Sequence, residues 1–440
     1  MCGSLQNSHR ERERDRESTQ RESTRTVRTV LSSSPSVMGA RMSRTLVSTA
    51  SLSVVASASR LLPVRMLGTA AAPVNLYGLH DEEMVRMLGE WGQPKFRAKQ
   101  LKSWLYDAPA VTHIDEMTNL PKALRAKLAE HTTLGEMSVA HQQESSDGTR
   151  KRLWQCHDDA LIESVLMPYA DNRRTACISS QVGCAMGCTF CATGQMGFKR
   201  DLTETEIFEQ AARFAAELRE KDERLSNVVF MGMGEPFRNY DAVLGAARRI
   251  MTDLGIGARH ITISTVGLVP QIRRFADECA ATGLEVKLAI SLHESTDEKR
   301  SSIMPVNRRW QLDELIDACH YYVQQSGRRI TFEWALISGK NDDAATAKRL
   351  ATRLRGLKCH VNLIPLNPTR GFDGRPSSLP NAEAFIKVLE SNGIPATVRV
   401  RRGIDIDAGC GQLADAASKE LVIKKITSRD RRRASSASTT

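Results

Sequence analysis

The chain has 440 residues and a formal net charge of +11, from 62 basic and 51 acidic side chains. Hydrophobic residues make up 41% and charged residues 26% of it, which excludes a fully disordered chain, a collagen-like chain and a small disulfide-stapled protein. No stretch of about 18 consecutive apolar residues is present, so the sequence predicts no membrane span. The positive charge suggests an acidic partner such as nucleic acid, provided that it lies in the folded part of the chain.

The excess positive charge lies at the two ends. Residues 1–80 carry 11 Arg and five acidic residues, residues 419–440 carry seven basic and two acidic ones, and residues 81–418 are neutral overall. Between Ser23 and His80 the chain is rich in Arg and Ser and has no Asp or Glu, which is typical of an organellar transit peptide. We expect residues 1–79 to be a disordered transit peptide and residues 419–440 a disordered basic tail. The predicted location is a mitochondrial matrix or plastid stroma, or the cytoplasm if the extension is only a disordered tail.

Residues 80–136 are predicted to form a helical domain. Apolar residues at helical spacing indicate helices over Asp81–Trp91, Phe96–Tyr106 and Leu120–Leu128. The second of these helices carries a group of basic side chains: Lys95, Arg97, Lys99 and Lys102. Such a group is typical either of an RNA-binding surface or of a solvated helix face. Residues 137–169 are predicted to follow as a short β linker.

Strand and helix signals alternate between residues 170 and 418. The predicted strands are Thr175–Ser180, Asn227–Met231, His260–Thr265, Val286–Leu292, Ile330–Leu336, His360–Pro365 and Ala396–Val400. The helices predicted between them are Thr203–Lys221, Asp241–Leu254, Val269–Thr282, Leu312–Ser326, Asp342–Leu354 and Asn381–Asn392. Six β/α units in series predict an α/β fold with a parallel sheet, as an open or closed barrel. In such sheets the chemistry gathers at the C-terminal ends of the strands.

Three of the ten cysteines follow the first predicted strand of this region. Cys184, Cys188 and Cys191 have the spacing C-x3-C-x2-C. A tight loop of this kind can place three thiolates on three corners of an iron–sulfur cube and leave the fourth iron open. Zinc normally takes four ligands, and a disulfide framework is unexpected in a chain of this size without a secretory signal. The spacing therefore predicts a [4Fe–4S] cluster whose open iron binds S-adenosylmethionine for radical chemistry.

Polar groups recur at the ends of the later predicted strands. They are Gly234 and Glu235 after the second strand, Ser264 at the third, Ser291 and His293 at the fourth, and Asn367 after the sixth. Taken singly, each fits a turn or a satisfied structural polar residue. Because they recur at the same end of successive strands, they predict the rim of one cofactor cleft.

Several segments together resemble the RlmN family of radical-SAM methyltransferases. They are the cluster loop and the stretches Glu163–Pro168, Cys177–Cys184, Gly232–Pro236, Ser291–His293, Ile364–Pro368 and Arg402–Leu413. The resemblance covers roughly residues 80–418. It implies a radical-SAM partial (β/α)6 barrel over residues 170–418, with residues 80–136 as a small helical RNA-binding domain and residues 137–169 as its β linker.

The resemblance implies methylation of C2 of adenosine in 23S-type ribosomal RNA and in transfer RNA, with two molecules of S-adenosylmethionine per turnover. One molecule methylates Cys410, and the second is cleaved at the cluster to a radical that removes hydrogen from this methyl group. The resulting methylene radical adds to C2, and Cys177 then attacks the Cys410 sulfur and resolves the adduct as a disulfide. Glu163 matches the residue proposed in this family to help move the proton.

The resemblance also assigns the cofactor contacts and the partners. The contacts fall on Gly234, Glu235, Ser264, Ser291, Leu292, His293 and Asn367. The partners are an rRNA or tRNA substrate and an electron donor such as flavodoxin or ferredoxin, and the chain is expected to be a monomer. Arg399, Arg401 and Arg402 lie shortly before Cys410 and are further candidates for RNA contact, or else part of a solvated face.

Two other functions remain open from the sequence. One is methylation of C8 of the same adenosine, as in the Cfr family, because the motifs do not separate C2 from C8. The other is a non-catalytic RNA-binding or assembly factor that keeps an iron–sulfur cluster. That function would leave at least one of Cys177 and Cys410 dispensable, as a buried structural thiol.

Overall fold

The computed structural model describes residues 73–109 and 111–413, which belong to one compact unit. The transit peptide expected over residues 1–79 lies outside the described residues except for 73–79, and the tail expected over residues 419–440 lies outside them entirely. None of the helices in the described ranges is long and apolar enough to cross a bilayer.

The N-terminal part of the described chain is a small helical bundle. Its helices are α2 (Asp81–Glu90), α3 (Phe96–Tyr106) and α4 (Lys122–His131), with 3-10 turns at Leu76–Gly78 and Ile114–Glu116. Strand β1 (Val74–Asn75) pairs in parallel with β2 (Thr132–Thr133), which ties the two ends of the bundle together. The boundary expected between residues 79 and 80 is therefore too late, since the bundle already begins at Val74.

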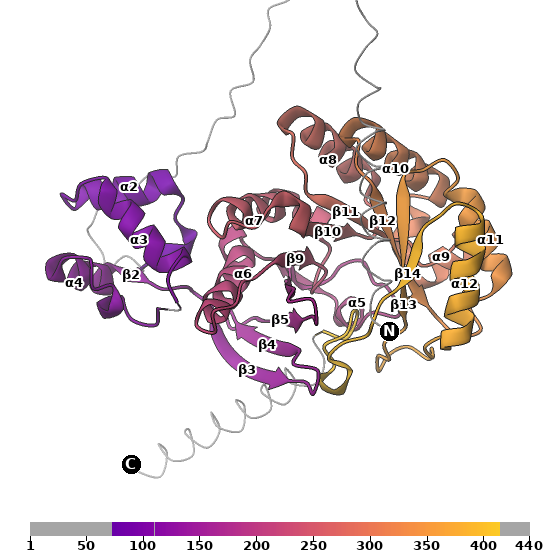
Figure 1. The fold of residues 1–440 in the computed structure, drawn as a ribbon, viewed down its shortest axis with the longest axis horizontal. Coiled ribbons are helices and arrows are strands. Elements are labelled where there is room, and N and C mark those ends of the chain that lie inside the picture. Colours follow the sequence, from indigo (N-terminus) through magenta and orange to yellow (C-terminus); the bar gives the residue numbers. More distant parts are fainter. Residues whose placement is uncertain (1–72, 110, 414–440) are drawn as a thin grey trace, which may run out of the picture. The chain divides into compact units, whose positions relative to one another are not determined.

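A 10-stranded sheet forms the centre of the remaining chain, with the strand order β14-β13-β12-β11-β10-β9-β6-β5-β4-β3 (Figure 1). The parallel strands are β6 (Arg174–Cys177), β9 (Asn227–Phe230), β10 (Ile261–Thr265), β11 (Lys287–Ser291), β12 (Ile330–Leu336), β13 (Cys359–Pro365) and β14 (Ala396–Val398). The end strands β14 and β3 do not pair with each other, so the barrel is open.

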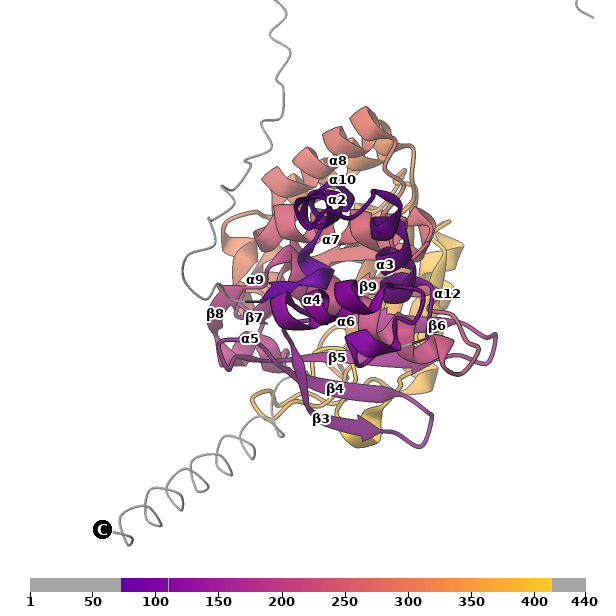
Figure 2. The same ribbon diagram turned by 90° about the vertical axis from the view of Figure 1, so that its left-hand side faces the viewer.

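Three antiparallel strands extend this sheet beyond β6. They are β3 (Ser138–Glu144), β4 (Arg150–Gln155) and β5 (Leu161–Pro168), and they lie side by side in both ribbon views (Figures 1 and 2). Strand β5 pairs directly with β6, which places Val165 opposite Cys177. Residues 137–169, expected to be a separate linker, are therefore part of the central sheet.

Helices connect the successive parallel strands. They are α6 (Glu204–Arg219), α7 (Tyr240–Thr252), α8 (Val269–Thr282), α10 (Leu312–Ser326), α11 (Ala344–Arg353) and α12 (Leu379–Ser391), with the short α9 (Asp297–Ile303) before α10. The capping box at the start of α6 is present, since the Thr203 hydroxyl accepts from the Glu206 N–H at 3.1 Å and the Glu206 carboxylate accepts from the Thr203 N–H at 2.9 Å. The predicted α/β fold with six β/α units is thus confirmed.

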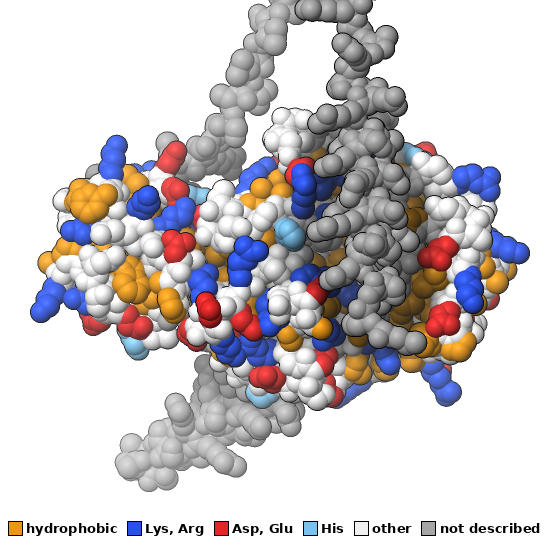
Figure 3. Space-filling model, viewed as in Figure 1, with side chains coloured by type: hydrophobic (Ala, Val, Ile, Leu, Met, Phe, Trp, Pro, Cys, Tyr) orange, Lys and Arg blue, Asp and Glu red, His pale blue; other side chains and the backbone are white. Residues whose placement is uncertain are grey.

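The basic group expected on the second helix is partly used inside the protein. Lys102 on α3 pairs with Asp81 and, at 3.0 Å, with Asp253 after α7, so it joins the bundle to the sheet-containing part. Arg97 donates to the Gln100 side chain at 2.6 Å. Lys95 and Lys99 are exposed. On the face shown in Figure 3, basic side chains lie among acidic and apolar ones, in keeping with a neutral body.

Candidate active site

The C-terminal ends of the parallel strands open into one cavity, which we call the central cavity. Its empty space, counted together with the open solvent at its mouth, is about 1060 Å³. Its lining includes all three clustered cysteines and the strand-end residues Gly234, Glu235, Ser264, Ser291, His293 and Asn367, together with Cys410. The structure therefore brings together almost all of the residues expected at the rim.

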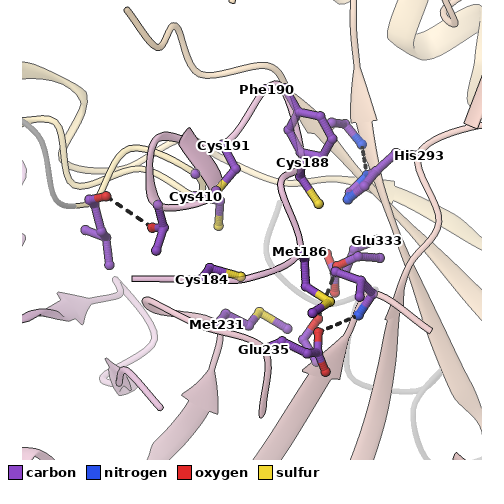
Figure 4. A pocket seen from close by; sticks show the side chains of 18 of the residues that line it. Cys184, Met186, Cys188, Phe190, Cys191, Met231, Glu235, His293, Glu333 and Cys410 are labelled. Carbon is purple, nitrogen blue, oxygen red and sulfur yellow. Dashed lines mark hydrogen bonds between the residues drawn. The ribbon is translucent and has the colours of Figure 1, made fainter. Parts of the chain in front are cut away.

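The three clustered cysteines lie on a loop held by a short hairpin. Strand β7 (Gln181–Gly183) pairs with β8 (Phe198–Asp201), and helix α5 (Ala192–Met196) follows the last cysteine. Gly183 has φ +75°, and an added Cβ there would collide with the backbone carbonyl of Gly197. This close approach closes the base of the loop, so that the sulfurs of Cys184, Cys188 and Cys191 face the same space (Figure 4).

The donor set fits an iron–sulfur cube better than a single ion. Within the described ranges, no three His, Cys, Asp or Glu side chains converge as ligands on one metal ion. The three thiols instead line the central cavity together, and three cysteine thiolates are ligands that an iron–sulfur cube accepts. Burial raises the pKa of Cys184 to about 12 and that of Cys188 well above its usual value, so bound iron would be needed to keep them ionised.

The loop after β9 brings backbone close to the central cavity. An added Cβ at Gly232 would lie 2.7 Å from the Ile178 carbonyl, and one at Gly234, which has φ +103°, would lie 2.6–2.8 Å from Gln181. Glu235 is 1% exposed, and its two carboxylate oxygens accept from the N–H groups of Phe237 (2.9 Å) and Val266 (2.8 Å). Burial raises the pKa of Glu235 to about 7. The carboxylate is thus fixed in position with lone pairs left for a ligand.

The rim at β10 and β11 is fixed by a buried arginine that the sequence analysis did not identify. Ser264 and Ser291 face each other across adjacent strands, with 3.5 Å between their hydroxyl oxygens. Behind them Arg300 is fully buried and donates to the carbonyls of Val266 (2.7 Å) and Ser291 (3.2 Å). These bonds hold the two strand ends in one geometry.

His293 presents a neutral ring to the central cavity. Its Nδ1 accepts from the Ala335 N–H at 2.9 Å, so the proton lies on Nε2, and the Phe190 ring packs against it with a centroid separation of 4.9 Å. Burial, with the charge of Arg300, lowers the pKa of His293 to about 3. Leu292 differs from its neighbours because its side chain is fully buried outside the cavity lining. The cofactor contact expected for Leu292 can therefore involve only its backbone. The backbone N–H of Leu292 already donates to the Glu333 carbonyl.

Asn367 connects the central cavity to the loop that carries Cys410. Its Nδ2 donates to the Cys410 carbonyl at 3.1 Å, whereas its Oδ1 is buried and has no partner. Such an unpaired acceptor at a cavity wall marks a place for a ligand donor. The Cys410 loop is also fixed to the cluster loop, because the Ala192 N–H donates to the Gly411 carbonyl at 2.7 Å.

A second cavity, which we call the thiol cavity, adjoins the first. Its lining includes Cys177, Cys410, Tyr169 and Arg399, and it shares Met231, Ile364, Asn367, Cys410 and Leu413 with the central cavity. Both thiols are free. Cys410 therefore lies on the wall between a space bordered by the cluster cysteines and a space bordered by Cys177.

Glu163 lies outside both cavities. It is 1% exposed on β5, and its carboxylate is 3.6 Å from the ammonium of Lys151. Lys151 also donates to the Asp407 carbonyl at 3.3 Å, so a buried lysine links Glu163 to the Cys410 loop. Lys151 and Glu333, like Arg300, are residues of this region that no local motif in the sequence marks.

Comparisons with known proteins agree with this geometry. Residues 178–350 match the radical SAM superfamily, and residues 74–134 match the family described as ribosomal RNA large subunit methyltransferase N-terminal domain. The dual-specificity RNA methyltransferase RlmN 1 of Myxococcus xanthus is 50% identical over 342 residues, which is 77% of this chain and 94% of that protein. The crystal structure of a radical SAM methyltransferase from Sphaerobacter thermophilus superposes with a TM-score of 0.73 at 48% identity, covering 78% of this chain and 99% of that one. The chain therefore belongs to the RlmN family of dual-specificity RNA methyltransferases, which are enzymes of the radical SAM superfamily.

Proposed function

We propose that this enzyme methylates C2 of adenosine in 23S-type ribosomal RNA and in transfer RNA through an S-methylated Cys410. The observation that carries this proposal is the position of Cys410 on the wall shared by the central cavity and the thiol cavity. Cys410 can receive a methyl group in the central cavity and pass it to a base in the thiol cavity, which Cys177 also lines. A cluster-bearing assembly factor would have no use for that arrangement.

The cofactor set follows from the lining of the central cavity. Cys184, Cys188 and Cys191 would hold a [4Fe–4S] cluster, which supplies one electron for the cleavage of S-adenosylmethionine. Asn367 Oδ1 and the Glu235 carboxylate are fixed acceptors for the amino donors of S-adenosylmethionine. The paired hydroxyls of Ser264 and Ser291 are suited to its carboxylate or ribose.

The two thiols divide the work of methyl transfer. The Cys410 thiolate bonds to the methyl carbon of one S-adenosylmethionine, and the electron pair of the broken S–CH3 bond stays on the sulfur of S-adenosylhomocysteine. Joining this carbon to C2 removes one hydrogen atom from the S-methyl group, which 5′-deoxyadenosine would carry away, and the adduct then gives up one electron and the C2 proton. The Cys177 thiolate next attacks the Cys410 sulfur and forms a disulfide. The sulfur–carbon bond breaks, its electron pair goes to the carbon, and a proton completes the methyl group. A dithiol reductant has to restore the two thiols.

Glu163 is the proposed aid to proton movement in this scheme. It shares a face of the antiparallel pair with Cys177, since Val165 lies opposite Cys177 and Glu163 is two residues along β5. Lys151 links it to the Cys410 loop. Because Glu163 borders neither cavity, any proton it moves would have to travel through intervening groups or water.

The target base enters the thiol cavity in this proposal. An adenine can reach it only after extrusion from its stack. Tyr169 borders the cavity, and the guanidinium groups of Arg173 and Arg402 each lie 4.5 Å from the centre of its ring. These planar groups are suited to stacking with an unpaired base. We further propose that the electron donor is of the flavodoxin or ferredoxin type, that the enzyme is a monomer and that it acts in an organelle.

The test is methylation of RNA that carries deuterium at one carbon of adenine. Reconstituted enzyme is given 23S-type rRNA fragments and tRNA labelled at C2 or at C8, and the digested nucleosides are analysed by mass spectrometry. We expect methyladenosine that has lost the C2 label and kept the C8 label. Loss of the C8 label would show the Cfr-type reaction instead, and no methylation by cluster-loaded enzyme would contradict the proposal.

Replacing Gly234 with Ala is expected to weaken S-adenosylmethionine binding more than 10-fold. The added Cβ would press on Gln181, whose side chain accepts from the Glu235 N–H at 2.8 Å. Strained backbone and overpacking together should cost about 2–4 kcal/mol of folding stability. Gly283→Ala is the matched control, because Gly283 also has positive φ (+66°) but nothing within 4 Å of an added Cβ. Equal losses of stability and equal cofactor affinity in the two variants, measured by thermal unfolding and equilibrium binding, would contradict the close approach.

A further inference from the structure

Arg399 is held on the wall that carries both thiols. It follows strand β14, and its backbone N–H donates to the Leu363 carbonyl of β13 at 2.7 Å. Its side chain lines the thiol cavity with Cys177 and Cys410, and its Nη1 lies 4.0 Å from the sulfur of Met231. Met231 itself lines the thiol cavity beside Cys177. The guanidinium is therefore placed by the sheet and not by a flexible tail.

The guanidinium of Arg399 has no carboxylate partner at ion-pair distance among the residues that the structure describes. The groups that face its charge are Cys410, Glu333, Tyr169 and Cys177. Of these, Glu333 already accepts from the Asn362 amide at 2.7 Å. An arginine stays protonated under all ordinary conditions, so a fixed positive charge borders the two sulfurs.

The neighbouring arginines are placed differently. Arg401 is exposed. Arg402 stacks on the Tyr169 ring and approaches Asp147 at 3.8 Å. Of the three arginines considered for RNA contact, Arg399 is thus the one whose charge is directed to the thiols.

The proposed reaction needs a thiolate twice, at Cys410 to take the methyl group and at Cys177 to release the product. Thiolates and not thiols are the reacting nucleophiles. Burial raises the pKa of Cys177 to about 12, and the Arg399 charge opposes this effect. A nearby cation favours the charged form of a thiol.

We propose that Arg399 is a positioning residue that favours the nucleophilic thiolate form of Cys177, the sulfur that releases the product. This inference rests on the proposed function for its role in turnover. The ionisation of Cys177 can nevertheless be measured without RNA, so failure of this inference and failure of the proposed function are distinguishable.

The experiment measures the reactivity of each sulfur against pH in the cluster-loaded full chain. Iodoacetamide alkylation is stopped at intervals and followed by peptide mass spectrometry. Trypsin releases Cys410 as the single cysteine of residues 403–419, and Cys177 within residues 175–199. The variants are Arg399→Gln, Arg399→Met and Arg399→Lys. Arg259→Gln is the control, because Arg259 lies at the N-terminal end of β10 and pairs with Glu285 at 2.9 Å. Cluster absorbance and RNA affinity are measured in parallel.

Arg399→Gln is expected to move the alkylation profile of Cys177 to higher pH and to slow its alkylation near pH 8 about 10-fold, which corresponds to one pKa unit. Arg399→Lys should keep rates within about 3-fold of the unsubstituted enzyme, since it keeps the charge. An unchanged Cys177 profile in Arg399→Gln, or a loss confined to RNA affinity, would overturn the proposal. If Arg399→Gln does not hold its cluster, the alkylation rates of Arg399→Lys and Arg399→Met are compared instead. Equal rates in these two variants would also overturn the proposal.

Discussion

Replacing Cys177 with Ala is expected to stop the reaction at a covalent complex between the protein and its RNA. Without this thiol nothing in the thiol cavity attacks the Cys410 sulfur, so the carbon on C2 stays bonded to it. Turnover should fall at least about 10³-fold, the loss typical of removing a covalent catalyst. Labelled RNA should migrate with the protein in denaturing gels, and residues 403–419 should carry the mass of the attached nucleotide.

Two variants serve as controls for this complex. The double variant Cys177→Ala, Cys410→Ala should form none, because the carrier sulfur is gone. Cys156→Ala removes another buried thiol, on a residue that borders neither of the two cavities, and should turn over normally. Cluster-loaded Cys177→Ala that forms no adduct would show that Cys177 does not resolve the product.

Replacing Cys188 with Ala is expected to abolish the cluster and with it all methylation. Three thiolates are offered to the cube, and loss of the buried central one leaves two ligands for four irons. After anaerobic reconstitution the broad visible absorbance should be absent, and iron should fall from about four per chain to the level of unspecific binding. Thermal unfolding of the reconstituted protein should also begin earlier, because bound metal stabilises the folded state.

Cys279→Ala is the matched control for the cluster. Cys279 is as buried as Cys188 but lies on α8, away from both cavities. It should keep full absorbance and iron content. Equal spectra in Cys188→Ala and Cys279→Ala would mean that the cysteine triplet does not bind the cluster.

The fold and most of the rim could be predicted because their signals are local. Helices α3, α8 and α10 and strand β12 have the predicted bounds, since apolar spacing marks them in the sequence. The cysteine triplet and the strand-end residues stand out because each occurs at a recurring place in the β/α pattern. Hairpin β7–β8 and helix α5 were not predicted, because their short segments carry no periodic signal and depend on the close contact at Gly183.

Leu292 shows that neighbouring residues of one motif can lie differently. Successive side chains of a strand point to opposite faces, so Ser291 and Leu292 cannot both face the cavity. His293 returns to it because its backbone has φ +61°, an uncommon value outside glycine. The roles of Arg300 and Lys151, and the position of Arg399 beside the two thiols, could not be predicted for a different reason. Their partners lie on other strands and loops, so their roles arise only once the chain has folded.

The attachment of the Cys410 loop to the cluster loop also bears on the order in which the enzyme is made. The Ala192 N–H bonds to the Gly411 carbonyl and the Thr193 hydroxyl to the Leu413 carbonyl, across more than 200 residues of sequence. Because a ribosome releases the chain from its N-terminus, the strands of the barrel can pair while Cys410 is still unmade. A nascent or truncated chain would then already carry the cluster ligands but not the residue that receives the methyl group. The ability to modify RNA is completed by the last segment of the described chain to be synthesised.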